Sequence, residues 1–373
     1  MSPDLTFLIL FVVVVVWTLL PLLPMFFELY RRTDVAPLAV PAHFEGDTPH
    51  FARRFRAYID HQLEEMPAPL PTDKRRHLPD GTPVYVVDEA SPFKSEYPEK
   101  RVPATPPRVT VTAVPVTIPA KTNALREVYA ERWMEAGDSC VFRSVFGEES
   151  VDLGENTCVL RWVHAADVLH AGADSQLYGR ASAGDRLEID EGCRFERLFA
   201  PEIRFGAGAA RGRVRDTISL RKLEPDLPPL ASTPVHRTGE NGVDRRLPLR
   251  IVGDYELPPR TLLERDLIVS GELRVGEGCV AKGSLKGTNG IALGEDVTVG
   301  GSVVTEGNLW LKAGCTVRGP LIAERDVFIE RDCCIGAGGV QTTVTSARIY
   351  IEPGVTVHGT VWAREVGLVA ALS

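Results

Sequence analysis

Apolar residues in the last third of the chain recur with a period of 18 residues. One column of this repeat consists of Leu273, Ile291, Leu309 and Val327, and Ile349 continues it after a four-residue insertion. A second apolar residue stands two positions after each member, and a small residue stands ten positions after it. The second apolar column is Val275, Leu293, Leu311, Ile329 and Ile351, and the small column is Gly283, Gly301, Gly319, Ala337 and Gly359. A fixed period of this length predicts a solenoid, because a single repeat of this size cannot bury its own apolar face.

Each repeat is predicted to contain three short strands. Its apolar residues also follow a six-residue sub-period, which is too short for a helix. Apolar residues at the first and third positions, followed by Gly, Asp or Glu, fit a strand that ends at a corner. The content of Val, Ile and Thr also favours strands. The predicted fold class is therefore an all-β parallel β-helix, a triangular solenoid of about 18 residues per coil.

The same period continues more loosely upstream. Its columns there are Trp133, Val151, Leu169 and Leu187, then Val141, Val159, Leu177 and Phe195, and then Val145, Val163, Ala181 and Phe199. In this alignment the charged Glu135 occupies an apolar position. We therefore predict a first solenoid segment over residues 114–205 and a second over residues 251–366. Residues 206–250 break the period with Pro, Gly and charged residues, and we predict a loop insertion at a corner.

Four of the seven cysteines fall in one inward-facing column of the predicted coil. They are Cys193, Cys279, Cys315 and Cys333, and a thiol at such a position behaves as a small hydrophobic side chain. The chain has no C-x-x-C pair, and the adjacent Cys333 and Cys334 would point to opposite faces of a strand. An odd number of cysteines without a framework spacing favours a reducing compartment. We predict no metal site and no cofactor.

The second strong pattern is the uncharged stretch from Leu5 to Phe27. As a helix its 23 residues would be roughly 34 Å long, enough to cross a bilayer core of about 30 Å. A cleaved signal peptide is the alternative, but residues 1–4 contain no Lys or Arg and the apolar run is too long. We predict a retained transmembrane α-helix over residues 5–27, with anchor positions at Leu5, Phe11, Val14, Trp17, Leu20 and Phe27. Because Arg31 and Arg32 follow directly, the positive-inside rule places the bulk of this single-pass chain in the cytoplasm.

Residues 28–113 are rich in Pro and are predicted to be a linker that contains one amphipathic helix, over residues 49–66. Thr48 is the expected N-cap of this helix and Pro49 its first residue. The apolar face is Phe51, Phe55, Ile59 and Leu63, and the basic residues beside it are Arg53, Arg54 and Arg56. Two interpretations stay open. The helix lies on an anionic membrane leaflet, or its apolar face packs on the end of the solenoid or on another protomer.

Composition and motifs give little indication of catalysis or of nucleic-acid binding. A net charge of −8 provides no basic footprint for a nucleic acid. The chain lacks the G-x-S-x-G, Walker A and H-E-x-x-H motifs. The sharpest cluster of candidate residues is His164, Asp167, His170 and Asp174, but the two histidines are six residues apart and belong to adjacent sides of the triangle. We favour solvated surface positions for them and predict that the protein is not an enzyme.

The enzyme alternative is a hexapeptide-repeat-type acyltransferase that acts on an envelope saccharide. Its left-handed β-helix has coils of the same length, and each hexapeptide pairs one bulky aliphatic residue with one small interior residue. In this chain both inward positions of a strand are often bulky, as with Leu273 and Val275. The active-site His and the C-terminal helix of that enzyme class are not evident in the sequence. The acyltransferase therefore ranks second.

The repeats resemble the bactofilin family. The stretches that carry the resemblance are residues 294–307 (GEDVTVGGSVVTEG) and 313–324 (AGCTVRGPLIAE), with a hydrophobic triplet, a Gly corner and a small residue before Glu. The resemblance covers residues 255–363 well and residues 114–205 loosely. It implies a right-handed β-helix, end-to-end polymerisation without nucleotide, attachment to the bacterial inner membrane, and a cytoskeletal scaffold that localises cell-envelope or exopolysaccharide machinery. The two segments and the 206–250 insertion depart from the family pattern.

The ends of a β-helix carry unpaired N–H and C=O groups that can bind another chain. Residues 366–372 are apolar and uncharged, which makes a poor cap against solvent. We predict a polymer interface at Val366, Leu368, Val369 and Leu372. The alternative is that this tail folds back as the cap of its own solenoid. The expected partners are other copies of the chain, the lipid bilayer and unidentified envelope-synthesis proteins.

Overall fold

The computed structural model describes residues 3–20, 48–65, 76–87, 93, 109–206 and 248–370. The chain divides into two compact units, Met1–Asp47 and Thr48–Ser373, and each is described by itself. The first unit contains helix α1 (Pro3–Leu19). The second contains helix α3 (His50–Glu64) and all of the described strands.

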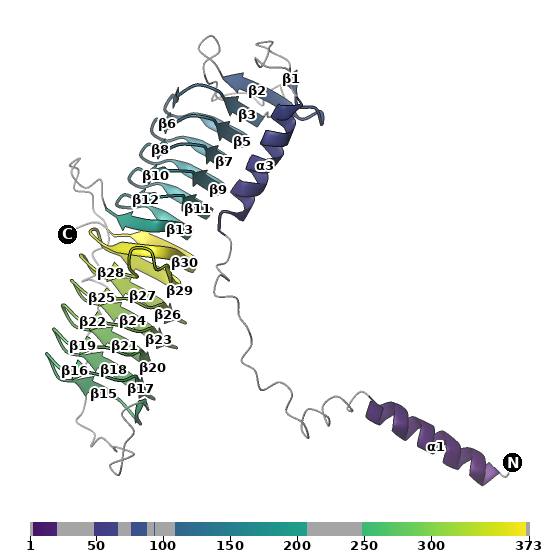
Figure 1. Cartoon of the computed structure of the whole chain (residues 1–373), viewed down its shortest axis with the longest axis vertical. Coiled ribbons are helices and arrows are strands. Elements are labelled where there is room, and N and C mark those ends of the chain that lie inside the picture. The colour runs from purple at the N-terminus through teal and green to yellow at the C-terminus, as the bar shows by residue number, and fades with distance from the viewer. Residues whose placement is uncertain are drawn as a thin grey trace. The chain divides into compact units, whose positions relative to one another are not determined.

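The second unit is a β-solenoid of about 12 turns with a spacing near 18 residues (Figure 1). Its first segment consists of β1 (Arg76–His77), β2 (Pro83–Val87), β3 (Val109–Thr112), β4 (Val116–Ile118), β5 (Asn123–Ala130), β6 (Met134–Ala136), β7 (Val141–Gly147), β8 (Val151–Leu153), β9 (Cys158–Ala165), β10 (Val168–Ala171), β11 (Gln176–Ala183), β12 (Arg186–Ile189) and β13 (Arg194–Phe205). Its second segment begins with β14 (Leu249–Ile251), β15 (Tyr255–Leu257), β16 (Leu262–Leu263), β17 (Leu267–Val269), β18 (Glu272–Val275), β19 (Val280–Ala281), β20 (Leu285–Gly287), β21 (Gly290–Leu293) and β22 (Thr298–Val299). It ends with β23 (Val303–Thr305), β24 (Asn308–Leu311), β25 (Thr316–Val317), β26 (Leu321–Ala323), β27 (Asp326–Ile329), β28 (Cys334–Ile335), β29 (Thr342–Ile351) and β30 (Thr356–Val369).

Parallel pairing between successive coils confirms the predicted period in the second segment. The column Leu273, Ile291, Leu309 and Val327 pairs residue by residue at a spacing of 18. The next step joins Val327 to Ile349, where the sequence showed the four-residue insertion. The inserted residues form a turn in which Ala337 bridges Val340. An insertion at a corner leaves the strand pairs on both sides intact, so the stack continues.

The first segment has the same architecture, but the predicted alignment is wrong by one residue at its start. Met134, and not Trp133, pairs with Val151, so this coil is one residue shorter than the period. Met134 and Ala136 are buried in the core, whereas Trp133 is 42% exposed. Glu135 stands between the two inward-facing residues of β6 and points to solvent. Its charge therefore occupies an ordinary outward position.

Two further columns of the alignment predicted for the first segment are also wrong by one residue in one coil. In the second column the buried residue is Phe142, and not Val141, and it pairs with Val159. In the third column Leu198, and not Phe199, pairs with Ala181. The register shifts between the strands concerned in both cases. Such an irregularity moves the inward position by one residue without changing the hydrophobic character of the strand.

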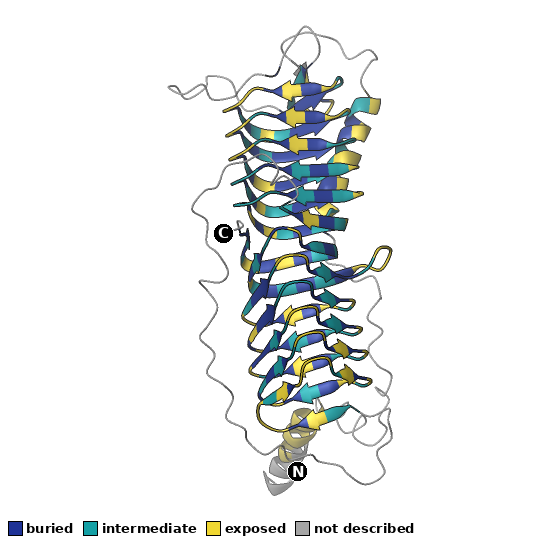
Figure 2. Cartoon of the chain, turned by 90° about the vertical axis from the view of Figure 1, so that its left-hand side faces the viewer, coloured by how far each residue is buried: buried dark blue, intermediate teal, exposed yellow. Residues whose placement is uncertain are grey.

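One apolar core runs through both segments (Figure 2). Both inward positions of a strand are buried, as with Leu273 and Val275. Enclosing each such aliphatic side chain contributes about 1.5–3 kcal/mol to folding. The four cysteines that were predicted to point inward are buried, and all seven cysteines are free thiols.

The two segments meet through an antiparallel strand pair. Strand β13 ends the first segment, β30 ends the second, and the two pair from Arg194 opposite Leu368 to Arg204 opposite Thr356, with two register shifts. Strand β30 also pairs in parallel with β28 and β29, so it belongs fully to the second segment. The chain direction along the solenoid axis therefore reverses between the segments, and their C-terminal ends face each other in the middle of the unit (Figure 1).

Helix α3 lies along the flank of the first segment (Figure 1). Ala52 and Ile59 are buried there. The aromatic side chains in the same cluster are Tyr129, Phe146 and Trp162. The apolar face of the helix therefore packs on the solenoid, on its side and not on its end. Pro49 is the N-cap residue and no side chain caps the helix, so the predicted Thr48 cap is wrong.

Strands β1 to β3 carry the sheet upstream of residue 114, into the region predicted to be a linker. Strand β2 pairs in parallel with β3, and β1 pairs with β2 in the antiparallel sense. The remainder of the predicted linker, and residues 207–247 of the predicted insertion, lie outside the described ranges. The right hand of the coil stays a prediction.

Helix α1 contains 17 residues. Across the described ranges, no helix is both long enough and apolar enough to cross a membrane. The predicted anchor extends to Phe27, and residues 21–47 are not among those described.

The column of small residues marks a corner where successive coils approach closely. A Cβ added at Gly319 would lie 2.6 Å from the backbone of Gly301, and one added at Gly301 would lie 2.7 Å from the backbone of Gly283. We expect Gly319→Ala to lower the free energy of unfolding by about 1–3 kcal/mol, because the coils would have to separate. Urea titration followed by circular dichroism measures this loss.

Gly338→Ala is the matched control, since a Cβ at Gly338 would meet nothing within 4 Å. We expect this variant to keep the stability of the parent chain. If both variants were equally stable, close approach of the coils would not explain why this column contains small residues.

Candidate functional site

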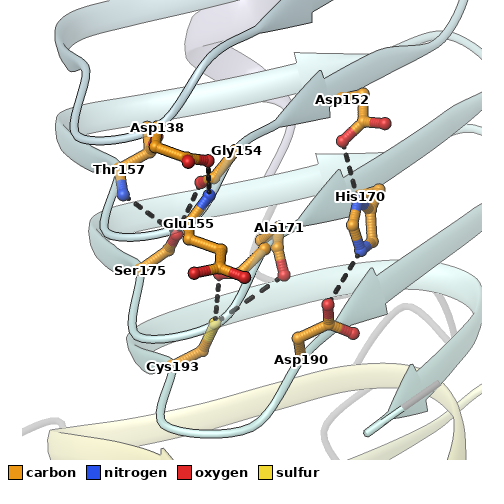
Figure 3. A network of polar contacts seen from close by, with 11 residues as sticks. Asp138, Asp152, Gly154, Glu155, Thr157, His170, Ala171, Ser175, Asp190 and Cys193 are labelled. Carbon is orange, nitrogen blue, oxygen red and sulfur yellow. Dashed lines mark hydrogen bonds and ion pairs between the residues drawn. The ribbon is translucent and has the colours of Figure 1, made fainter. Parts of the chain in front are cut away.

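Three charged side chains of the first segment form a connected row across neighbouring coils (Figure 3). Nδ1 of His170 lies 2.7 Å from Oδ1 of Asp152, and its Nε2 lies 3.2 Å from Oδ2 of Asp190. Asp152 stands opposite His170 in the β8–β10 pair, and Asp190 directly follows β12, the strand that pairs with β10 on its other side. We call these three residues the His170 clamp.

Hydrogen bonds to Asp152 and then to Asp190 raise the pKa of His170 to about 10, against a smaller opposing effect of burial. Both ring nitrogens then donate hydrogen bonds, and the imidazolium neutralises repulsion between two carboxylates. A general base needs a neutral nitrogen with a free lone pair. The clamp therefore fits a structural tie between three coils better than it fits a proton acceptor.

His164 has a separate set of neighbours. Its Nδ1 lies 2.9 Å from Oγ of Ser182, and its ring centroid lies 5.2 Å from that of Phe146. Burial, with smaller effects of Arg53 and Arg56, lowers the pKa of His164 to about 4. A neutral His beside a Ser has the chemistry of a base and its nucleophile. However, Ser182 is only 2% exposed, so its hydroxyl is not accessible to a substrate.

The structure places the other two candidates of this cluster at corners. The backbone carbonyl of Asp167 accepts hydrogen bonds from the next coil. Asp174 adopts a φ of 60°, and its carboxylate fills the space beside Gly192. Within the described part of the chain, no group of three or more His, Cys, Asp and Glu side chains could hold a metal ion.

Figure 3 also shows how polar groups near the clamp are satisfied between coils. The backbone N–H of Thr157 donates to Oγ of Ser175 at 3.1 Å. The thiol of Cys193 donates to the carbonyl of Ala171 at 3.7 Å. Burial raises the pKa of the Cys193 thiol, which makes it a poor nucleophile. The polar groups at this corner therefore stabilise the contact between successive coils.

Sequence reasoning missed two aromatic columns, which belong to buried clusters separate from the main core. In the second segment Trp310 stacks on Phe328 with ring centroids 4.4 Å apart, and Phe328 stacks on Tyr350 at 5.1 Å. In the first segment Tyr129 stacks on Phe146 at 5.6 Å. A signal was present, because these residues follow the coil period as closely as the inward aliphatic residues do.

The first coil of the second segment presents backbone groups that have no hydrogen-bond partner among the described residues. The carbonyls of Ile251, Leu257 and Leu263 accept hydrogen bonds from the following coil. Backbone groups of successive strand residues point to opposite sides, so those of the intervening residues point away from the solenoid. These residues are Arg250 of β14, Glu256 of β15 and Leu262 of β16. We call this row the open edge.

The C-terminal tail, by contrast, is engaged within the chain. Val366, Leu368 and Val369 lie on β30, which pairs with β29 on one side and with β13 on the other. Val369 is fully buried. Leu372, the fourth residue of the predicted polymer interface, lies outside the described residues. The surface that was predicted to join copies is therefore, as far as it is described, a contact between the two segments of one chain, because the chain direction reverses.

Four of the predicted anchor residues have described, exposed side chains at the N-terminal helix. They are Phe11, Val14, Trp17 and Leu20. Leu5 belongs to α1, and Phe27 is not among the described residues. A continuous exposed apolar surface of this kind is typical of contact with a membrane or with another protein.

Comparisons of the chain with protein-family models, with curated proteins and with solved structures found no match. A function must therefore be inferred from the residues and contacts of this chain. Two features stand out: the closed junction between β13 and β30, and the open edge at β14, β15 and β16.

The raised pKa of His170 predicts a loss of stability in alkali. An unfolded His titrates at about 6.5, so the stabilisation is fully present below that pH and is lost as the pH rises through about 10. We expect His170→Gln to lower the free energy of unfolding by about 1–3 kcal/mol at pH 6, and by less at pH 10. Urea titrations at the two pH values measure the difference.

His358→Gln is the matched control, because the Nδ1 of the half-buried His358 lies 3.0 Å from the backbone carbonyl oxygen of Pro201 and not from a carboxylate. NMR titration of the ring protons provides a direct check on the parent chain. A His170 ring that titrates near pH 6.5 would contradict the charged clamp.

Proposed function

We propose that this protein is a membrane-tethered, self-associating β-helical scaffold. The observation that carries the proposal is the open edge: β14, β15 and β16 each pair with one described strand, in the following coil. The backbone groups of Arg250, Glu256 and Leu262 therefore point away from the solenoid. Strand edges of this kind bind other strands unless they are covered. A second copy of the chain supplies an edge of the same length and spacing.

The junction within the chain supports this mode of association. Strands β13 and β30 join two solenoid ends by antiparallel pairing, in spite of two register shifts. Two open edges from separate copies can meet in the same way about a twofold axis, since that arrangement also runs antiparallel. The inward residues at this end would become fully enclosed, including Leu263, which is 8% exposed against 1% for Ala281 in the next coil.

The opposite end of the rod is less suited to pairing. Strand β2 covers β3 on one side of the triangle, and β1 pairs with β2 in the antiparallel sense. A short antiparallel hairpin blunts an edge because it interrupts the parallel order of the coils. Self-association through the open edge therefore produces a dimer first, and longer assemblies need a second contact.

The solenoid interior favours a structural role over the acyltransferase alternative. Both inward positions of the strands enclose bulky aliphatic side chains, as with Ile291 and Leu293. The hexapeptide pattern of that enzyme class pairs a bulky residue with a small one. Recruitment of cell-envelope or exopolysaccharide machinery is the role that the bactofilin resemblance suggests for such a scaffold.

The tether is proposed from the N-terminal apolar segment. Its described residues expose Phe11, Val14 and Trp17, and the uncharged sequence continues to Phe27. The basic residues Arg31 and Arg32 that follow support a cytoplasmic location of the solenoid.

Glu256→Pro tests the open edge directly. Proline removes the outward N–H of Glu256, which has no partner within the described ranges, and leaves the hydrogen bond from Gly276 to Leu257 in place. We expect the full-length chain in detergent to sediment as a dimer or larger species, and the variant to shift to a monomer without loss of the thermal midpoint. Sedimentation velocity over a range of concentrations provides the measurement.

Glu256→Ala is the matched control, because it removes the side chain but keeps the N–H. We expect this variant to associate as the parent does. A parent chain that stays monomeric at high concentration, or a proline variant that associates normally, would rule out pairing through this edge.

Val14→Arg tests the tether. A charge at the centre of a membrane-spanning helix costs about 2.5–3.5 kcal/mol, so we expect the variant to leave the membrane fraction after an alkaline wash. Val14→Leu keeps the segment apolar and should be retained. Release of the parent chain from the membrane fraction by the same wash would contradict the proposed tether.

A further inference from the structure

Helix α3 packs on one side of the triangular coil, which we call the helix-bearing side (Figure 1). In the first segment this side is formed by the second halves of β5, β7, β9 and β11. Phe55 of the helix packs on Trp162 of β9 with ring centroids 5.4 Å apart. One turn earlier, the ring of Phe51 lies 4.7 Å from the guanidinium of Arg180 on β11. Successive turns of the helix therefore contact successive coils.

Strand pairing continues the helix-bearing side into the second segment. Arg180 pairs with Arg197 of β13, which faces Trp362 of β30 across the junction. Trp362 pairs with Thr345 of β29, and Thr345 pairs with Ile322 of β26. The column then continues, one residue per coil, through Val304, Lys286, Ile268 and Arg250. These residues hold the outward positions of their strands, so they form the surface of this side.

In the second segment this surface is apolar and partly exposed. Trp362 is 42% exposed and Ile322 is 36% exposed, and Val304 and Ile268 are half-buried. Helix α3 is the one described helix of its unit, and its first turn lies at β11, in the first segment. An apolar surface that continues an existing protein contact is typical of a binding site for another protein.

The spacing of the column fits an α-helix. Coils repeat at roughly 4.8 Å and helix turns at roughly 5.4 Å, so a helix along the solenoid axis presents about one turn to each coil. The column from Ile268 to Trp362 contains five such steps. It is therefore roughly 24 Å long, the length of a helix of about 16 residues. Helix α3, which covers the first segment in this way, has 15 residues.

Charged residues beside the column indicate which kind of helix fits. In the first segment Arg56 of α3 pairs at 2.7 Å with Glu148, which directly follows β7. In the second segment the exposed Glu306 directly follows β23 in the same way. Lys286 and Arg250, both exposed, lie nearer the outer end and favour carboxylates. A helix that is basic in the half nearer the junction and acidic in the other half complements these charges.

Helix α3 itself has this order of charges. Its arginines all precede residue 57, and its carboxylates all follow residue 59. Its first turn, at β11, is the end nearer the junction. The contact between α3 and the first segment is therefore a template for a second helix on the second segment.

We propose that the helix-bearing side of the second segment docks an amphipathic α-helix of a partner protein. The partner helix has the chemistry of α3: an apolar stripe, with basic residues in its first half and acidic residues in its second. Trp362, Ile322 and Val304 contact the apolar stripe, one per helix turn. This inference rests on the proposed scaffold function, because it names the class of partner that the scaffold recruits.

A synthetic peptide of residues 48–65 is the probe, because it has the apolar stripe and the charge order of α3. We expect the labelled peptide to bind the full-length chain in detergent. Fluorescence anisotropy measures this binding, with detergent alone as the background. We expect Ile322→Arg and Val304→Arg each to weaken binding about ten-fold, because each places a charge against the apolar stripe.

Thr316→Arg is the matched control. Thr316 lies on β25, which pairs with β22 and β28 on another side of the coil. We expect this variant to bind the peptide as the parent chain does. A peptide with Phe55→Ser and Ile59→Ser keeps every charge of the probe but loses the apolar stripe, and we expect it not to bind.

The proposal is overturned if the peptide does not bind to the parent chain. It is also overturned if Ile322→Arg and Val304→Arg keep the thermal midpoint and bind as the parent does, or if Thr316→Arg loses as much affinity. Loss of self-association in Ile322→Arg, with peptide binding unchanged, would assign this side to a contact between copies and would equally overturn it.

The Glu256→Pro variant separates this inference from self-association at the open edge. We expect this variant to bind the peptide as the parent does, because Glu256 and the column lie on different sides of the coil. A parent chain that binds the peptide but stays monomeric would contradict self-association alone. A parent chain that associates but does not bind the peptide would contradict helix docking alone.

Discussion

Hydrogen bonding between successive coils is the constraint on which the rest of this structure depends. A coil of about 18 residues cannot satisfy its own backbone groups, so each strand residue bonds either to the coil before it or to the coil after it. Residues at the same position of each coil therefore stack at strand spacing, and each column must hold side chains that tolerate that contact. Aliphatic residues fill the interior columns, Gly301 and Gly319 occupy the corner where no Cβ fits, and His170 can reach Asp152 because the two stand in register.

The same constraint explains why the junction is antiparallel. The two segments present their last coils to each other, and strands that run in opposite directions can satisfy both edges only by antiparallel pairing. This contact closes two ends at once, and Val369 and Ala370 of the C-terminal tail are buried. It also places Arg197 beside Trp362, although 165 residues separate them in the sequence. A surface that combines groups from α3, β11, β13 and β30 exists only because the chain reverses.

The sequence was sufficient to predict the solenoid, because coil pairing repeats a local spacing that can be read directly. The prediction was wrong where one residue is lost, since Trp133 and Met134 are both apolar and the period alone cannot decide between them. The partners of both histidines were within reach of the same reasoning, because Asp152 precedes His170 by 18 residues and Ser182 follows His164 by 18. The pairing of β13 with β30 could not be predicted from the sequence, because no period connects the two strands. The end that looked open from the sequence was therefore the closed one.

The reversal also changes what kind of assembly the rod can make. In a solenoid that runs in one direction the two ends are complementary, and head-to-tail contacts extend without limit. In this chain both outer ends are the starts of segments, so they are alike in direction and cannot pair head to tail. Contacts between like ends are isologous, and each such contact closes on itself. The proposed pairing through the open edge at β14, β15 and β16 thus joins two copies into a closed dimer. A filament also requires that the end with β1 and β2 pairs with the same end of another copy. In the proposed self-association the hairpin at that end favours a dimer over a polymer, because it interrupts the parallel edge on one side of the triangle.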